Sequence, residues 1–227
     1  NDMRTSLAER RFKVFYQPKY DFKTEKIVGV EALVRWDHPK LGMVSPGVFI
    51  ELFERNGFIT EIDYFVWEEA CKKLKEWTDN GYKNLSISVN VSRINLYNNN
   101  LPNLLIELVK KYNISPKSLH LEITESAYTE NSEQIIEGAE RLKKIGFIIE
   151  MDDFGTGYSS LNMLAKLPID VLKLDMGFVH SIEKDKNSLI LLKVIINLAK
   201  ELQLAIVAEG VETNKQVNIL KNIGCQY

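Results

Sequence analysis

Cysteine and histidine are scarce in this chain: its 227 residues include two cysteines and three histidines. Cys71 and Cys225 have no metal-ligand spacing, so the sequence does not indicate a zinc site and we expect two reduced thiols. Long apolar runs are also missing, since the longest, residues 189–199, contains Lys193 and is too short to span a bilayer. No signal peptide opens the chain. We expect a cytoplasmic domain with no membrane insertion by this segment, whether or not a longer parent protein is anchored through other regions.

An excess of positive charge is absent as well. The chain has 29 Lys and Arg against 31 Asp and Glu, for a formal net charge of −2. Binding to a nucleic-acid polymer depends on a basic stripe that displaces counterions, so we expect no such partner. A small phosphorylated ligand is compatible with this balance, because bound cations can supply positive charge locally.

What the chain does have is an alternation of strand-like and helix-like runs after Gly81, which is typical of successive βα units. We therefore predict an α/β fold, a TIM-type (β/α)8 barrel, for which about 200 residues is the lower limit. The strand expected at 12–20 is joined to the next by a short turn, which predicts that the first strand is antiparallel. After the helix stop at Gly224 the chain ends at Tyr227, so the last strand should be truncated. We expect an N-terminal connector helix at 1–11 and the barrel at 12–227.

Six strand-like runs end in a carboxylate, an amide or an ammonium. In a parallel barrel the carboxyl ends of all strands lie on one face, so these polar groups should converge. Clustered acids repel one another unless divalent cations hold them, which indicates a metal-dependent enzyme. Oxygen ligands without His or Cys favour Mg²⁺ or Mn²⁺. The residues at these strand ends are Glu31, Asn90, Glu122, Asp152 with Asp153, Lys173 and Glu209.

Alternatives stay open for single residues in this pattern. Each acid, taken alone, could be an ordinary helix cap. Lys173 could orient or deprotonate a water, neutralise a phosphate, or form a structural ion pair with Asp175 or Glu209. Glu125 could fix the glycine loop at 155–157 or cap a helix. Glu150 has no assigned role, and no histidine is expected to be catalytic.

Several ordered motifs together resemble those of the EAL-domain family, the bacterial cyclic di-GMP phosphodiesterases. They run almost from end to end of the chain, and include Tyr16-Gln17-Pro18, Glu31-Ala32-Leu33, Arg35-Trp36, Asn90, Glu122, Asp152-Asp153-Phe154-Gly155-Thr156-Gly157, Lys173 and Ala208-Glu209-Gly210-Val211-Glu212.

The resemblance implies that one phosphodiester bond of cyclic di-GMP is hydrolysed to give linear pGpG. It implies two Mg²⁺ or Mn²⁺ ions per site, with Ca²⁺ inhibitory. Carried over by position, the catalytic residues are Glu31, Lys173 and Glu209, with Lys173 positioning or activating a bridging water. The first metal would be held by Glu31, Asn90, Glu122 and Asp152, and the second by Asp152, Asp153 and Glu209. Substrate contacts would come from Gln17, Leu33, Arg35, Asp175 and Glu212, and Glu125 would order the loop after Asp153.

The resemblance also implies partners. We expect a homodimer, and the first nine residues resemble the connector after a GGDEF domain, so an upstream GGDEF or sensory domain is expected in the parent protein. Met176-Gly177 departs from the Arg-Ser frequent in the family, and Gln226 is not assigned a role. The alternative function is a catalytically inactive sensor domain that binds cyclic di-GMP without cleaving it. A protein-interaction scaffold would leave the polar strand ends unexplained.

Overall fold

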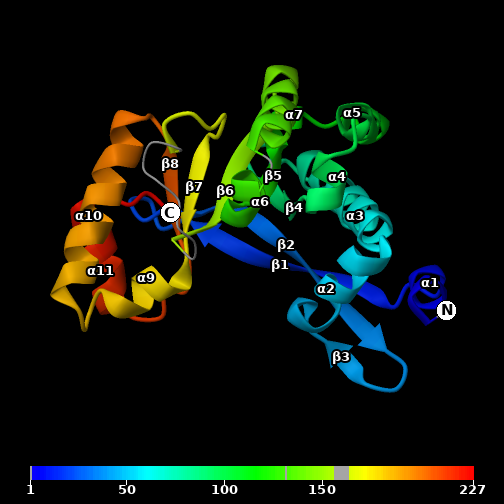
Figure 1. Cartoon of the computed structure of the whole chain (residues 1–227), viewed down its shortest axis with the longest axis horizontal. Helices are drawn as coiled ribbons and strands as arrows, with labels where there is room; N and C mark the ends of the chain where they lie inside the picture. The colour runs from blue at the N-terminus through cyan, green and yellow to red at the C-terminus, as the bar shows by residue number, and fades with distance from the viewer. Residues whose placement is uncertain (1, 131, 156–163) are drawn as a thin grey trace.

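A curled sheet of eight strands organises the chain, and helices pack against it (Figure 1). The computed structural model describes residues 2–130, 132–155 and 164–227. The strands are β1 (Phe12–Tyr20), β2 (Ile27–His38), β3 (Gly42–Val44), β4 (Ser86–Asn90), β5 (Leu119–Thr124), β6 (Ile148–Phe154), β7 (Val171–Leu174) and β8 (Ala205–Ala208). The helices are α1 (Asp2–Ala8), α2 (Pro46–Asn56), α3 (Ile59–Asp79), α4 (Arg93–Leu96), α5 (Leu101–Lys111), the 3-10 helix η1 (Pro116–Ser118), α6 (Glu125–Glu130), α7 (Ser132–Ile145), α9 (Met176–Ser181), α10 (Lys186–Glu201) and α11 (Asn214–Ile223).

The strand order is that of an opened TIM-like barrel. The strands follow one another as β1-β2-β4-β5-β6-β7-β8, with β3 added to β2. β1 and β3 are antiparallel to β2, and every later neighbour pair is parallel. This confirms the predicted α/β class and the reversed first strand, in the form of a curled half-barrel.

The end of the chain lies where the eighth barrel strand was expected. The Tyr227 backbone N–H donates to Ile206 O at 3.1 Å, and Tyr227 O accepts from the Ala208 N–H at 2.8 Å. Gln226 O accepts from the Phe22 N–H, in the turn after β1, at 2.9 Å. Residues 225–227, which follow Gly224, therefore lie between β8 and the β1–β2 turn.

One boundary differs from the sequence prediction. The strand expected to end at Glu31 continues to His38, because its second half pairs with β1, as in the match of Trp36 to Phe12. The parallel ladder with β4 nevertheless stops at the Glu31–Ser88 pair. Glu31 thus lies at the end of the parallel part of the sheet although it is in the middle of a strand.

The alternation of strands and helices that was predicted after Gly81 is present. α10 begins at Lys186, because the Asp185 side chain caps it by accepting from the backbone N–H groups of Asn187 and Ser188. α2 and β3 were not predicted. None of the described helices is both long and apolar enough to cross a lipid bilayer.

The core lies between the sheet and the helices that cover it. Trp67, Ala70, Cys71 and Leu74 of α3 are buried, as expected for a helix that packs an apolar face on a sheet. Both cysteines are free and buried, and burial raises the pKa of each thiol to about 12. Neither is a reactive thiolate at neutral pH.

Candidate metal centre

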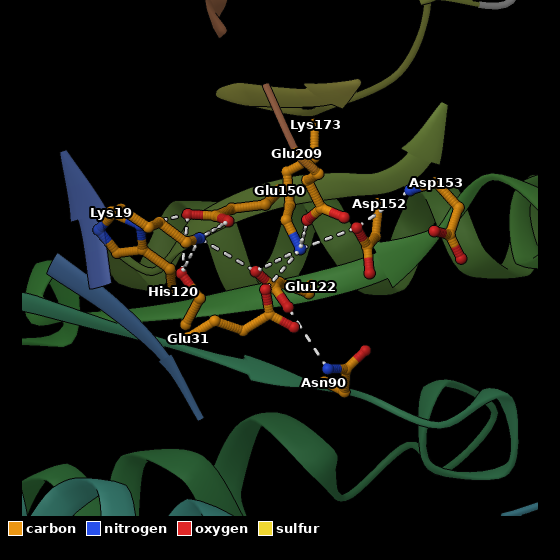
Figure 2. A network of polar contacts seen from close by, with 11 residues as sticks. Lys19, Glu31, Asn90, His120, Glu122, Glu150, Asp152, Asp153, Lys173 and Glu209 are labelled. Atoms are coloured by element: carbon orange, nitrogen blue, oxygen red, sulfur yellow. Dashed lines mark hydrogen bonds and ion pairs between the residues drawn. The ribbon is translucent and has the colours of Figure 1, made fainter. Parts of the chain in front are cut away.

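The carboxyl ends of the parallel strands bring the predicted polar residues together around one ammonium group (Figure 2). Lys173, in the middle of β7, is 1% exposed in its side chain, and its Nζ contacts carboxylates from four other segments. The distances are 3.0 Å to Glu31 Oε2, 3.0 Å to Glu122 Oε1, 2.8 Å to Asp152 Oδ1 and 2.8 Å to Glu209 Oε1. Residues more than 170 positions apart in the sequence therefore meet at one point, as the barrel geometry predicted.

Two groups of three carboxylates are arranged so that each could hold a cation. In each group, one oxygen from every member lies within 4.8 Å of the others. The first group is Glu31, Glu122 and Asp152, and the second is Asp152, Asp153 and Glu209. Asp152 belongs to both, so it could bridge two ions. The Asn90 amide lies 3.4 Å from Glu122 Oε2 and could add an oxygen to the first group. Such an all-oxygen donor set suits a hard cation.

The backbone at Asp153 separates the two adjacent aspartates. Asp153 has φ 56°, in the left-handed region that non-glycine residues seldom adopt. The pairing of β6 with β7 is irregular between Met151 and Phe154, and Asp153 lies within this stretch. The Asp153 N–H donates to Asp152 Oδ1 at 3.0 Å. An oxygen of Asp153 still lies within 4.8 Å of an oxygen of Asp152, and Figure 2 shows the two side chains next to one another.

Glu125 lies next to this kink. It is the first residue of α6, 1% exposed, and its Oε2 accepts the Gly155 backbone N–H at 2.7 Å. Gly155 has φ 105°, and a Cβ added there would lie 1.7 Å from the Phe178 ring, so only glycine fits. The carboxylate is thus bonded to the start of the segment it was predicted to order; Thr156 and Gly157 of that motif lie outside the described residues.

Burial and mutual charge set the protonation of these groups. Burial is the largest cause that raises the pKa of Glu122, well above the usual carboxyl value, and it also raises the pKa of Asp153 and Glu209. Burial alone would lower the pKa of Lys173, but the four surrounding carboxylates outweigh it and raise that pKa. The four carboxylates therefore favour the ammonium form of Lys173 in this arrangement.

A cleft of about 600 Å³ opens beside the acidic cluster. Its wall includes Glu31 and Glu209, together with Gln17 and Leu33, two of the predicted substrate contacts. The other three predicted contacts are not part of this wall. Arg35 donates to the Val34 carbonyl, Asp175 caps α9 through the Gly177 N–H, and Glu212 lies 3.7 Å from His180 with a 70% exposed side chain.

The chain matches the EAL domain family over residues 1–227. It belongs to the EAL domain family. It is 37% identical over 225 residues to the bifunctional diguanylate cyclase/cyclic di-GMP phosphodiesterase MucR of Pseudomonas aeruginosa, covering 99% of this chain and 33% of that protein. It is 36% identical over 225 residues to the cyclic di-GMP phosphodiesterase NbdA of the same organism, covering 99% of this chain and 29% of that protein.

A solved structure supports the same assignment. The PaMucR phosphodiesterase in complex with c-di-GMP superposes with a TM-score of 0.94 at 37% identity, covering 99% of this chain and 91% of that chain. The chain spans between 27% and 36% of the length of the curated relatives that it matches. The EAL fold and family are therefore shown for this segment.

This EAL domain also contains buried polar residues that the sequence did not single out (Figure 2). Lys19 of β1 and His120 of β5 both contact Glu150, at 2.7 Å and 2.6 Å. Burial disfavours the charged form of Glu150, but Lys19 and His120 outweigh it and lower its pKa. Glu150 alternates with Asp152 along β6, so an inward orientation could be read from the sequence, but its partners could not.

Asn90 is held from outside the sheet by α3. The Trp67 indole N–H donates to the Asn90 carbonyl at 3.0 Å. Asp63, one turn earlier, accepts the Ser92 N–H at 2.9 Å and the Asn95 side-chain N–H at 2.8 Å, which fixes the loop after β4. Burial raises the pKa of Asp63 to about 6. The sequence did not single out Trp67 or Asp63 as partners of the site.

Proposed function

We propose that this domain hydrolyses one phosphodiester bond of cyclic di-GMP to give linear pGpG, with two divalent cations in the site. The observation that carries the proposal is the pair of carboxylate groups that share Asp152 and lie beside a cleft. The relatives named cyclic di-GMP phosphodiesterases, and the related structure in complex with c-di-GMP, supply the substrate.

In this proposal Glu31, Asn90, Glu122 and Asp152 hold the first ion. Asp152, Asp153 and Glu209 hold the second. Mg²⁺ or Mn²⁺ fits this oxygen set, and we expect Ca²⁺ to inhibit, because its longer and more variable coordination disturbs an arrangement suited to a smaller ion. When bound, the two ions lower the pKa of a water and stabilise the negative charge that develops in an in-line displacement.

The remaining residues of the site bind the substrate or orient the groups that react with it. Lys173 supplies a fixed positive charge at the shared aspartate, where it can orient the attacking water and neutralise developing charge. Gln17, Leu33, Arg35, Asp175 and Glu212 contact the substrate. Arg35 has the bidentate fork that suits a phosphate. Glu125 keeps the segment after Asp153 ordered through Gly155.

The alternative function, a sensor that binds cyclic di-GMP without cleavage, differs in the acids it requires. Binding of cyclic di-GMP requires the cleft and, at most, the cations beside it. Hydrolysis also requires every carboxylate of the two cation groups and Lys173. All of them are present and converge, which favours the enzyme. We further propose a cytoplasmic location, a homodimer, and an upstream GGDEF or sensory domain in the parent protein, with residues 1–11 as its connector.

Incubation of the purified protein with cyclic di-GMP tests the proposal. We expect linear pGpG with Mg²⁺ or Mn²⁺ and none with Ca²⁺ or EDTA, measured by chromatography of the products. Glu31→Ala should reduce turnover at least a hundredfold, whereas Glu51→Ala, at a 74% exposed carboxylate on α2, should retain it. Tight binding of cyclic di-GMP without any product would instead identify a sensor.

A further inference from the structure

We propose that Lys19 is a positioning residue for Glu122: its ammonium holds one carboxylate oxygen so that the other faces Asn90 and the cation site. This inference rests on the proposed metal site. Lys19 does not follow the strand-end pattern that identifies the other site residues. It lies on β1, which runs opposite to the parallel strands of the sheet.

The reversed strand explains how Lys19 reaches the site. β1 is antiparallel to β2, so the end of β1 lies at the start of the parallel strands, and Lys19 pairs with Gly29. From there the Lys19 side chain, 12% exposed, extends toward Glu122 and Glu150 on one side of the acidic cluster (Figure 2). A lysine at the end of a parallel first strand would lie on the rim instead.

The contacts of Lys19 use all three of its ammonium donors. Nζ lies 2.7 Å from Ser88 Oγ, 2.7 Å from Glu150 Oε2 and 3.1 Å from Glu122 Oε1. An ammonium has three N–H donors and no acceptor, so its position is fully determined by these partners. Burial alone would lower the pKa of Lys19, but Glu122 and Glu150 outweigh it and raise that pKa.

Glu122 needs such a partner because its side chain is fully buried. A buried carboxylate without bonded partners is strongly unfavourable. Lys19 and Lys173 both contact Oε1, while Oε2 lies toward the Asn90 amide. Lys173 is shared among four carboxylates, whereas Lys19 contacts only two. Lys19 therefore contributes to the orientation of Glu122 in addition to Lys173.

Glu150, the second carboxylate that contacts Lys19, is itself fixed by other side chains. Glu150 accepts from Ser88 Oγ at 3.0 Å and contacts His120 Nδ1 at 2.6 Å, so it is anchored both to β5, the neighbouring strand, and to β4 beyond it. Lys19, Ser88, His120 and Glu150 form a partly buried layer next to the potential metal ligands, with Ser88 and Glu150 fully buried and Lys19 and His120 partly exposed. Residues in such a layer usually affect metal affinity by about 10-fold to 100-fold.

Cation affinity, measured without substrate, distinguishes positioning from simple charge. Removing a lysine next to a cation site should tighten cation binding if only charge mattered, because one repulsion is lost. If Lys19 positions Glu122, its removal should weaken binding. Isothermal titration of the purified protein with Mn²⁺ and Mg²⁺ gives the sign directly.

The matched pair is Glu150→Gln and the double variant Lys19→Met with Glu150→Gln. The double variant removes both charges of the buried pair, so no unpaired carboxylate is added at position 150. We expect it to bind Mn²⁺ about 10-fold or more weakly than Glu150→Gln alone. Equal or tighter binding would overturn the inference.

A second variant answers the question if the double variant fails to fold. Lys19→Arg keeps the charge, but its planar guanidinium cannot place three donors on the same partners. We expect cation binding about 10-fold weaker, and binding within twofold of the wild type would overturn the inference. If the wild-type protein itself takes up neither Mn²⁺ nor Mg²⁺, the proposed metal-dependent function fails instead, which separates the two outcomes.

Discussion

The ammonium of Lys173 lies 2.8 Å from Oδ1 of Asp152, the carboxylate that both potential cation groups share. The same contact that offsets the clustered negative charge therefore occurs at the point where two ions would meet. Lysine and cations compensate the same carboxylates, so the stability of this region should depend on which of them is present.

Lys173→Met should destabilise the cation-free protein. The substitution leaves four converging carboxylates without their common partner, and breaking a buried ion pair on one side usually costs about 3–5 kcal/mol of unfolding free energy. A cation at a concentration about 100 times its dissociation constant should restore about 2.7 kcal/mol. Urea unfolding in EDTA and in Mg²⁺ measures both effects. Lys144→Met, at a 78% exposed lysine, is the control, and equal stability of the two variants in EDTA would contradict the role of Lys173.

Glu125→Ala should loosen the segment after Asp153. The variant removes the charged acceptor of the Gly155 N–H, a kind of hydrogen bond worth about 1.5–3 kcal/mol. Hydrogen exchange at the Gly155 amide should become about 10-fold faster or more, and turnover should fall. Glu133→Ala, at an exposed glutamate of α7, is the matched control. Unchanged exchange at Gly155 would show that the carboxylate does not hold this segment.

Asp63→Asn should change how stability depends on pH. The native pKa of about 6 lies above the ordinary 3.8, so the folded protein binds this proton more tightly than the unfolded chain. The group therefore contributes most below pH 4, and the unfolding free energy falls as pH rises toward 6, by about 3 kcal/mol in total. Urea unfolding of both proteins between pH 4 and pH 8 should show that the wild type loses stability relative to Asp63→Asn. A constant difference across this range would contradict the prediction.

Trp67→Phe should weaken cation binding through Asn90. The change keeps an aromatic ring in the core but removes the donor to the Asn90 carbonyl, which is worth about 1 kcal/mol. We expect about fivefold weaker Mn²⁺ binding by titration calorimetry. Trp77→Phe, at the other tryptophan of the same helix, should leave the affinity unchanged. If both variants behave alike, the effect comes from packing.

Most of the fold and of the acidic cluster could be predicted from the sequence, because both depend on local signals. An apolar run followed by a carboxylate marks a strand end, and parallel strands must bring such ends together. The contacts of Lys173 with Glu31 and Glu209 follow from this rule without knowledge of the register. The reversed first strand followed from the short turn at residues 21–26.

The parts that could not be predicted depend on pairings between distant segments. Lys19 has no helical or strand-end signal, and its contacts with Glu122 and Glu150 require the register of β1 on β2 and the curl of the sheet. His120 looked isolated because its partner is 30 positions away on the neighbouring strand. β3 has three residues, too few for a periodic pattern.

The reversal of β1 also determines where the chain enters the domain. Phe12 lies opposite Trp36, beyond Glu31 in the direction of β2, and Arg4 of α1 pairs with Glu61 in the first turn of α3 at 3.1 Å. α1 is thus attached on the same side of the barrel as the carboxylate cluster. A module fused ahead of α1 would therefore be tethered at the Phe12 end of β1, one strand length away from the Lys19 and Tyr20 end that lines the cleft, so its movement would not have to distort the barrel itself.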